Sequence, residues 1–236
     1  MTFTLNRDTS GVPVAAYNDS KDVVKVDHVR KSFRDDFPGS SLDTTTNWTI
    51  IQTGAGMTIA VSSGYLVIST GTTQNSETIL RSKASYRLPA FLSAIVNLSQ
   101  RIANQEFYIE LMTADGKHIA GWKLDSTTAT QGKYMNENND MNTLSSAQTI
   151  LTTASDAILE IEAMLDGVQY HSRNLNGARA NNYVLHKNTP DMNQDYYIQI
   201  RAKNLGSSPS STTDFSVDAV NLIDISNVYN IPVTLI

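Results

Sequence analysis

The sequence consists of short β-branched and aromatic runs separated by turn residues, and this pattern restricts the chain to all-β folds. Between Phe33 and Thr70, two apolar runs, 57–61 and 65–69, are joined by Ser62-Ser63-Gly64. A glycine-containing link between two such runs is typical of a β-hairpin. Similar runs recur with turn signals roughly every 8–12 residues, which predicts an antiparallel β-sandwich or barrel.

An Asp-Gly dipeptide predicts a second hairpin in the middle of the chain. Asp115-Gly116 separates the apolar run 106–113 from the run 118–124. Asp-Gly is a strong hairpin signal because both residues tolerate the left-handed backbone that a tight turn needs. The polar segment 126–146 follows, and its lack of periodicity predicts one long loop or an elaborated hairpin.

The segment 157–165, with the sequence AILEIEAML, is compatible with two structures. Residue propensity alone would allow a helix. Asp166-Gly167 follows directly, however, and the run 168–173 then returns. This order of run, turn and run favours two paired strands.

Composition excludes several classes of function. The chain of 236 residues contains no cysteine, so disulfides and thiolate metal sites are excluded. Its net charge of −5 provides no basic patch for nucleic acid. Residues 1–8 lack the apolar core of a signal peptide, and no apolar run approaches the ~20 residues that would span a bilayer.

Residues 1–32 differ from the rest of the chain and are predicted to be an N-terminal anchoring arm. The segment 22–29 alternates charged residues with valine, but the region has too little apolar mass for a core of its own. We expect it to order by adding strands to a neighbouring protein, and the alternative is a flexible tail. Residues 33–236 are then expected to form the globular domain.

Two short segments carry a resemblance to a known family. Residues 35–43, with the sequence DDFPGSSLD, are followed by Trp48, and this opening resembles the first strand of concanavalin-like jelly-roll domains. Residues 214–222, with the sequence DFSVDAVNL, resemble the last strand of the same domains. Laminarinase-type glycoside hydrolases and related carbohydrate-binding modules share this fold. The resemblance implies one antiparallel jelly-roll β-sandwich whose first and last strands are neighbours.

The N-terminal arm and the Ser/Thr/Asn-rich composition resemble accessory virion proteins of tailed bacteriophages. This second resemblance implies a non-enzymatic structural protein of the virion, such as a decoration, fibre or tail component, assembled in the host cytoplasm. Its partners would be other virion proteins, bound through the arm, and a host-surface polysaccharide, and the protein would be a homo-oligomer. The alternatives are a secreted or cell-surface carbohydrate-binding module and, ranked lower, a laminarinase-like glycoside hydrolase.

The hydrolase alternative requires a particular set of carboxylates. The resemblance implies a catalytic strand with a glutamate nucleophile, an aspartate two residues later, and a glutamate acid/base after a bulge. The nearest match in the sequence is Glu160 and Glu162, which share one face of a strand. Leu165 occupies the third position, and Asp166 comes one residue late. We therefore expect no catalytic residues.

Sugar binding requires aromatic rings that stack on a pyranose and polar groups that bind its hydroxyls. The candidates for ligand binding are Trp122, Glu162, Tyr170 and Tyr183. The alternative is that these aromatic residues belong to the core of the sandwich.

The resemblance also implies a structural calcium ion between the first and last strands. Asp35, Asp36 and Asp218 would supply its oxygen ligands. The alternative is that Asp35 and Asp36 cap a turn. No other cofactor is expected, because none of the four histidines has a second ligand at metal-binding spacing.

Overall fold

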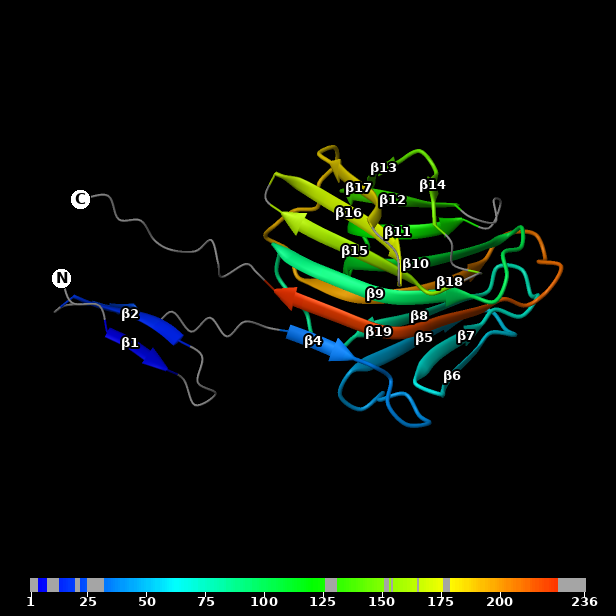
Figure 1. Ribbon diagram of the computed structural model, residues 1–236, viewed down its shortest axis with the longest axis horizontal. Coiled ribbons are helices and arrows are strands. Elements are labelled where there is room, and N and C mark those ends of the chain that lie inside the picture. Colours follow the sequence, from blue (N-terminus) through cyan, green and yellow to red (C-terminus); the bar gives the residue numbers. More distant parts are fainter. Residues whose placement is uncertain are drawn as a thin grey trace.

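The computed structural model describes residues 4–7, 13–19, 22–24, 32–125, 131–150, 153, 155–164, 166–175 and 179–224. From residue 32 onward, the described residues form an antiparallel jelly-roll sandwich of two sheets, as the sequence predicts (Figure 1). No helix in the described part of the chain could cross a membrane. The strand expected at 225–229 lies outside the described residues.

The sheet nearer the viewer in Figure 1 is named the β9 sheet after its central strand. Its strands run in the order β17 (Arg179–Leu185), β16 (Gly167–Asn174), β15 (Ala157–Met164), β9 (Ala90–Leu98), β19 (Asp214–Asp224), β7 (Tyr65–Ser69) and β6 (Thr58–Ser62), and β4 (Ser32–Asp35) also pairs with β19.

The second sheet is named the β10 sheet, also after its central strand. Its order is β13 (Met141–Leu144), β12 (Gln131–Asn138), β11 (His118–Asp125), β10 (Gln105–Thr113), β18 (Tyr196–Asn204), β8 (Glu77–Ser82) and β5 (Trp48–Thr53), and β14 (Gln148–Thr149) pairs with β12.

Three N-terminal strands form a small sheet of their own. They are β1 (Thr4–Arg7), β2 (Pro13–Asp19) and β3 (Asp22–Val24), paired antiparallel in that order. The strand character expected for the arm is present in these segments. The anchoring role of the arm stays a prediction.

The expected hairpins form at the predicted turns. β10 pairs with β11 around Asp115-Gly116, and β15 pairs with β16 in a register that places Met164 opposite Gly167. The prediction that 157–165 is a strand is therefore confirmed up to Met164. In the β6–β7 turn, Ser63 (φ 55°) and Gly64 (φ 81°) both adopt the left-handed conformation that two-residue hairpins favour.

The segment 126–146 contains an elaborated hairpin rather than one long loop. β12 and β13 pair antiparallel, and the turn between them contains Asn139 (φ 49°) and Asp140 (φ 64°). Asn and Asp are the non-glycine residues that most readily adopt positive φ values, so these two residues suit the turn.

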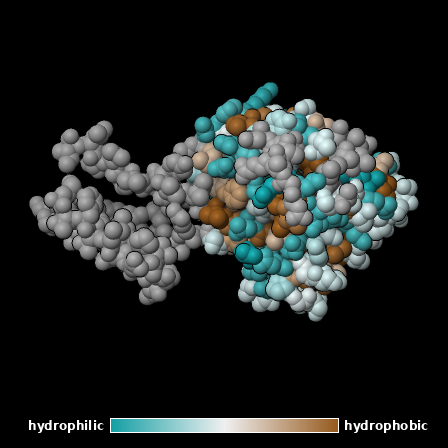
Figure 2. Space-filling model, in the orientation of Figure 1, coloured by the Kyte–Doolittle hydropathy of each residue, from teal (hydrophilic) through white to brown (hydrophobic). Residues whose placement is uncertain are grey.

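The hydrophobic core lies between the two sheets. Alternate residues of each strand point inward, such as Phe107, Ile109 and Leu111 on β10 and Leu92 and Val96 on β9, and all five are buried. The outer face of the β9 sheet carries polar and apolar residues interspersed (Figure 2). Burial of the inward-facing side chains is the main source of stability in a chain without disulfides.

The beginning and the end of the sandwich are joined, as the resemblance implies. β4 pairs with β19, and Phe33 lies opposite Leu222. The buried carboxylate of Asp35 accepts a hydrogen bond from Trp48 Nε1 at 2.7 Å, and Trp48 begins β5 in the other sheet. One carboxylate thus links the first strand of the β9 sheet to the edge strand of the β10 sheet.

Candidate active site on the outer face of the β10 sheet

Strand β10 presents two glutamates on the face of its sheet that points away from the core. Phe107, Ile109 and Leu111 belong to the core, so Glu106, Tyr108 and Glu110 point to the opposite side. The register of β10 with β11 and with β18 is continuous from Glu106 to Met112, so no bulge changes this alternation. Both carboxylates therefore belong to one face.

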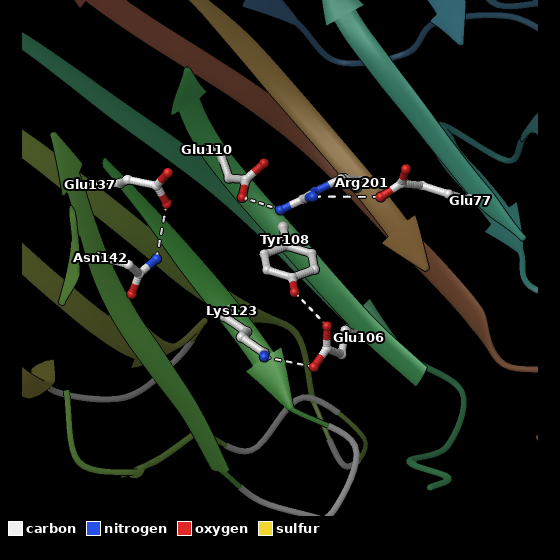
Figure 3. Close-up of polar contacts among 8 residues, drawn as sticks. All are labelled: Glu77, Glu106, Tyr108, Glu110, Lys123, Glu137, Asn142 and Arg201. Atoms are coloured by element: carbon white, nitrogen blue, oxygen red, sulfur yellow. Dashed lines mark hydrogen bonds and ion pairs between the residues drawn. The ribbon is translucent and has the colours of Figure 1, made fainter. Parts of the chain in front are cut away.

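The carboxylate of Glu106 has two donors. The hydroxyl of Tyr108 donates to Oε2 at 2.5 Å, and Lys123 Nζ on the neighbouring strand β11 lies 2.6 Å from Oε1 (Figure 3). Lys123 is placed there because it pairs with Tyr108 across the two strands. Hydrogen bonds to an ionised group are stronger than neutral ones, so these contacts hold Glu106 in one position.

The carboxylate of Glu110 is fully buried and has one cationic partner. Arg201 Nη2, on β18, donates to Glu110 Oε1 at 2.7 Å, and Arg201 Nη1 lies 3.5 Å from Glu77 on β8. Burial raises the pKa of Glu110, and the guanidinium of Arg201 offsets part of that rise. A raised pKa favours the protonated acid, which is the form that can donate a proton.

Tyr108 occupies the space between the two glutamates. Its ring lies between their side chains in Figure 3, and the guanidinium of Arg201 is 3.9 Å from the ring centroid. Burial and the hydrogen bond to Glu106 raise the pKa of Tyr108. The phenol therefore keeps its proton and acts as a donor to Glu106.

An apolar cluster borders the polar group on the same face. Met112 on β10, Ile119 on β11 and Met135 on β12 are buried together with Tyr108, although they point away from the main core. Beyond them, Asn142 Nδ2 donates to Glu137 Oε2 at 3.0 Å at the edge of the sheet (Figure 3). These buried side chains pack against one another beside the polar group, and apolar packing beside converging polar groups is common at ligand sites.

Two carboxyl groups on one face of a strand are the residue types that glycosidic bond cleavage uses. Most glycoside hydrolases place two carboxyl groups on either side of the bond, one as an acid and one as a nucleophile or base. Residues four apart on a strand have Cα atoms about 13 Å apart, and here the ring of Tyr108 lies between the two glutamate side chains (Figure 3).

Sequence reasoning missed the pair Glu106 and Glu110, although it predicted a strand over the same residues. The family pattern requires an aspartate two residues after the first glutamate and a bulge before the second. Here Tyr108 occupies the aspartate position, and the second glutamate follows without a bulge. The alternation Glu-x-Tyr-x-Glu between apolar residues is the signal that could have identified the pair.

The structure places Trp122 and Tyr170 inside the core. Both are fully buried, and their ring centroids lie 5.6 Å apart in an edge-to-face contact. Trp122 Nε1 donates to the carbonyl oxygen of Glu160 at 3.0 Å, and the hydroxyl of Tyr170 donates to the carbonyl oxygen of Met135 at 2.7 Å. Their rings pack between the sheets and offer no face to a sugar outside.

The other two predicted ligand residues do not join the site on β10 either. Tyr183, on the edge strand β17, is 37% exposed and stacks on Tyr134 at 5.3 Å. Glu162, like Glu160, belongs to β15 and points away from the core side of the β9 sheet. The structure therefore does not bring the four predicted residues together around one ligand.

Two of the three predicted calcium ligands, Asp35 and Asp36, have other partners in the structure, and Asp218 lies on β19 at the register shift between Val217 and Ala219. Asp35 uses Oδ1 to accept from the Phe37 amide at 2.8 Å and Oδ2 to accept from Trp48, which agrees with the turn-capping alternative. Asp36 forms an exposed ion pair with Arg34. Among the described residues, no group of three or more acidic or histidine side chains could hold a metal ion.

Comparison with known proteins identifies the fold. No protein-family model matches the sequence, and no curated protein matches it either. Solved structures do match. A non-specific endo-β-1,3(4)-glucanase of family GH16, SCLam, has a TM-score of 0.67 at 13% identity, over 82% of this chain and 91% of its own.

Two further solved structures have similar scores. The endo-β-1,3-glucanase from Pyrococcus furiosus has a TM-score of 0.63 at 12% identity, over 81% of this chain and 93% of its own. A structure from a report on endo-acting O-glycanases of human gut microbiota has a TM-score of 0.64 at 13% identity, over 81% and 98%. These similarities establish the concanavalin-like jelly-roll fold.

The expectation of a non-enzymatic bacteriophage virion protein is wrong. The similar structures described above are endo-acting glycanases, and they agree with the carbohydrate-active alternatives rather than with a virion component. The expectation that the chain is not an enzyme is corrected on the same finding. The chain was expected not to be an enzyme because the sequence lacks the family's carboxylate pattern. Strand β10 carries two glutamates on one face, but their spacing and the residue between them differ from that pattern.

Proposed function

We propose that this protein is a glycoside hydrolase that binds a polysaccharide across the outer face of the β10 sheet. Glu106 and Glu110 are its carboxylate pair. The observation that supports this proposal best is the placement of both glutamates on one face of a central strand, with a hydrogen-bonded tyrosine between them. A strand buried in the centre of a sheet gives such groups the fixed positions that catalysis needs.

The two glutamates divide the roles of acid and base. Glu110 is the general acid, because burial raises the pKa of its carboxyl group and so favours the protonated form. Its side chain is fully buried, so substrate binding has to displace the side chains that cover it before the proton reaches the leaving oxygen. Glu106 is the second carboxylate, positioned by Lys123 and Tyr108 to act on the sugar or on a water molecule. Arg201 positions Glu110 from the neighbouring strand.

The substrate class that we propose is a β-linked glucan. Two of the structurally similar enzymes are described as glucanases acting on β-1,3 or β-1,3(4) linkages. The third comes from a report on endo-acting O-glycanases that initiate mucin breakdown, so mucin O-glycans are the comparison substrate.

The experiment measures the release of reducing ends from laminarin, mixed-linkage β-glucan and mucin O-glycans. The wild-type protein is compared with Glu106→Gln and Glu110→Gln, which keep the shape of each side chain and remove its acid–base function. We expect each variant to lose at least about 100-fold in kcat, because acid–base catalysis contributes roughly that much or more.

A matched control changes a carboxylate outside the site. Asp140, in the exposed β12–β13 turn, has a positive φ that asparagine also tolerates, so Asp140→Asn should retain full activity. The proposal fails if the wild type releases no reducing ends from any of the three substrates. It fails equally if both glutamate variants remain as active as the control.

A further inference from the structure

A second feature of interest lies at the end of β10, beyond Glu110. It is a hollow of about 370 Å³, and the residues that carry the argument are Arg87, Asp115, Gln194, Asp195 and Tyr197. They come from the β10–β11 turn, from the segments that precede β9 and β18, and from β18 itself. Three separate parts of the chain therefore converge on one hollow: the segment before β9, the β10–β11 turn, and the start of β18 with the residues just before it.

Local hydrogen bonds hold one wall of the hollow in place. The hydroxyl of Thr113 donates to Asp115 Oδ1 at 2.6 Å, and the amide of Lys117 donates to the same oxygen at 3.1 Å. These bonds lower the pKa of Asp115, so its carboxylate is ionised at neutral pH. Both bonds use Oδ1, so Oδ2 is the oxygen that can accept from a ligand.

An ion pair forms the opposite wall. Arg87 Nε lies 2.7 Å from Asp195 Oδ1, and Arg87 Nη1 donates to the carbonyl oxygen of Asn193. The side chains of Arg87 and Asp195 are each about half exposed, at 50% and 53%. They are therefore close to one another and still accessible to a ligand.

An aromatic side chain also lines the hollow. Tyr197 lines the hollow from β18, where it pairs with Met112 of β10. An aromatic ring beside carboxylates, a guanidinium and an amide is the combination that recognises a pyranose, whose faces are apolar and whose edges carry hydroxyls. Two carboxylates against one guanidinium favour a neutral sugar over an anionic one.

We infer that this hollow is a binding subsite for one neutral sugar unit of the glycan. The inference rests on the proposed function, because it assumes that a glycan lies on the outer face of the β10 sheet. Met112, opposite Tyr197, is two residues from Glu110, or about 7 Å along the strand. A single oligosaccharide could therefore contact the carboxylate pair and the hollow together.

Isothermal titration calorimetry with laminarihexaose and a mixed-linkage glucan hexasaccharide tests the inference, in the full-length Glu106→Gln background. Tyr197→Ala removes the ring, and Arg87→Met removes the guanidinium. We expect each variant to raise the Kd about five- to tenfold, the loss expected for an aromatic or a charge-assisted contact. Tyr65→Ala, a tyrosine on the β9 sheet, is the control and should stay within about twofold.

Arg87→Met keeps the test decisive if Tyr197→Ala does not fold, because an exposed ion pair contributes little to stability. If both folded variants bind as tightly as the control, the subsite inference is overturned. The subsite inference is also overturned if the Glu106→Gln protein, without any further substitution, binds neither hexasaccharide.

The outcomes for subsite and enzyme are separable. A raised Kd in the two hollow variants, together with no glucan turnover by the wild type, would support the subsite and contradict the hydrolase. Turnover that depends on Glu106 and Glu110, together with an unchanged Kd, would support the hydrolase and contradict the subsite.

Discussion

At the scale of single residues, the most consequential feature is the ion pair of Glu110 and Arg201. The carboxylate is fully buried, and the side chain of Arg201 is 17% exposed. Removing two charges from water is costly, and their attraction compensates only when the geometry is good. Such a pair is therefore weak evidence for stability but sensitive to the loss of one partner.

Replacing Arg201 with methionine should destabilise the protein strongly. Glu110 would then be buried without its cation. Breaking a buried pair costs up to about 3–5 kcal/mol in the free energy of unfolding, and uptake of a proton by Glu110 lowers that cost at lower pH. Denaturant unfolding measures the change. The matched control is Arg34→Met, because Arg34 and Asp36 form a pair whose side chains are 72% and 50% exposed, and its loss should cost less than about 1 kcal/mol. Equal effects of the two substitutions would show that burial does not govern the strength of the Glu110 pair.

The side of the sheet on which a residue lies could be predicted from the sequence in part. On β11, Ala120, Trp122 and Leu124 alternate with Lys123, and this period of two places Trp122 in the core. The same reasoning on β10 places Glu106 and Glu110 outside. Arg201 could not be predicted as the partner of Glu110, because this pairing depends on which strand lies beside β10 in space.

At the scale of elements, the carboxylate of Asp35 connects strand β4 to strand β5. Asp35 accepts from the Phe37 amide and from Trp48 Nε1, and both Phe37 and Trp48 are buried. Trp48 also packs edge to face against Phe33 at 5.2 Å. The side chain thus holds the entry to the sandwich against the edge of the β10 sheet.

Substitution of Asp35 by alanine should weaken this connection. Two buried donors would lose their acceptor, and each costs about 1–3 kcal/mol, so the free energy of unfolding should fall by at least about 2 kcal/mol. Asp35→Asn keeps one acceptor oxygen and should cost less. Denaturant unfolding followed by tryptophan fluorescence provides the measurement. A change below about 0.5 kcal/mol for alanine would mean that water replaces the carboxylate without penalty.

Elements with local signals could be predicted from the sequence, and elements with distant partners could not. Asp115-Gly116 and Asp166-Gly167 specify hairpins because the turn residues carry the conformational preference themselves. The pairing of β9 with both β15 and β19 joins segments far apart in the chain, and no short motif encodes it. The resemblance near Asp35 and Phe215 supplied the one distant pairing that was expected, between the ends of the sandwich.

At the scale of the whole molecule, the jelly-roll fold could be predicted from the sequence, but the function of the protein could not. A polar surface of low charge and a chain without cysteine suit virion proteins, but they suit extracellular glycanases as well. One fold supports many functions, so the function must be argued from the site. The composition is compatible with both alternatives, so the proposed glycoside hydrolase activity is argued from the carboxylates of β10.

The central claim is that a glycan binds on the outer face of the β10 sheet, next to Glu106 and Glu110. The most direct test is a crystal structure of the Glu106→Gln variant soaked with laminaritetraose. We expect electron density for the sugar over β10 and β18, with a glycosidic oxygen within hydrogen-bonding distance, about 3 Å, of the Glu110 carboxyl group. Sugar bound instead on the outer face of the β9 sheet, with the face around Glu110 empty, would contradict the account.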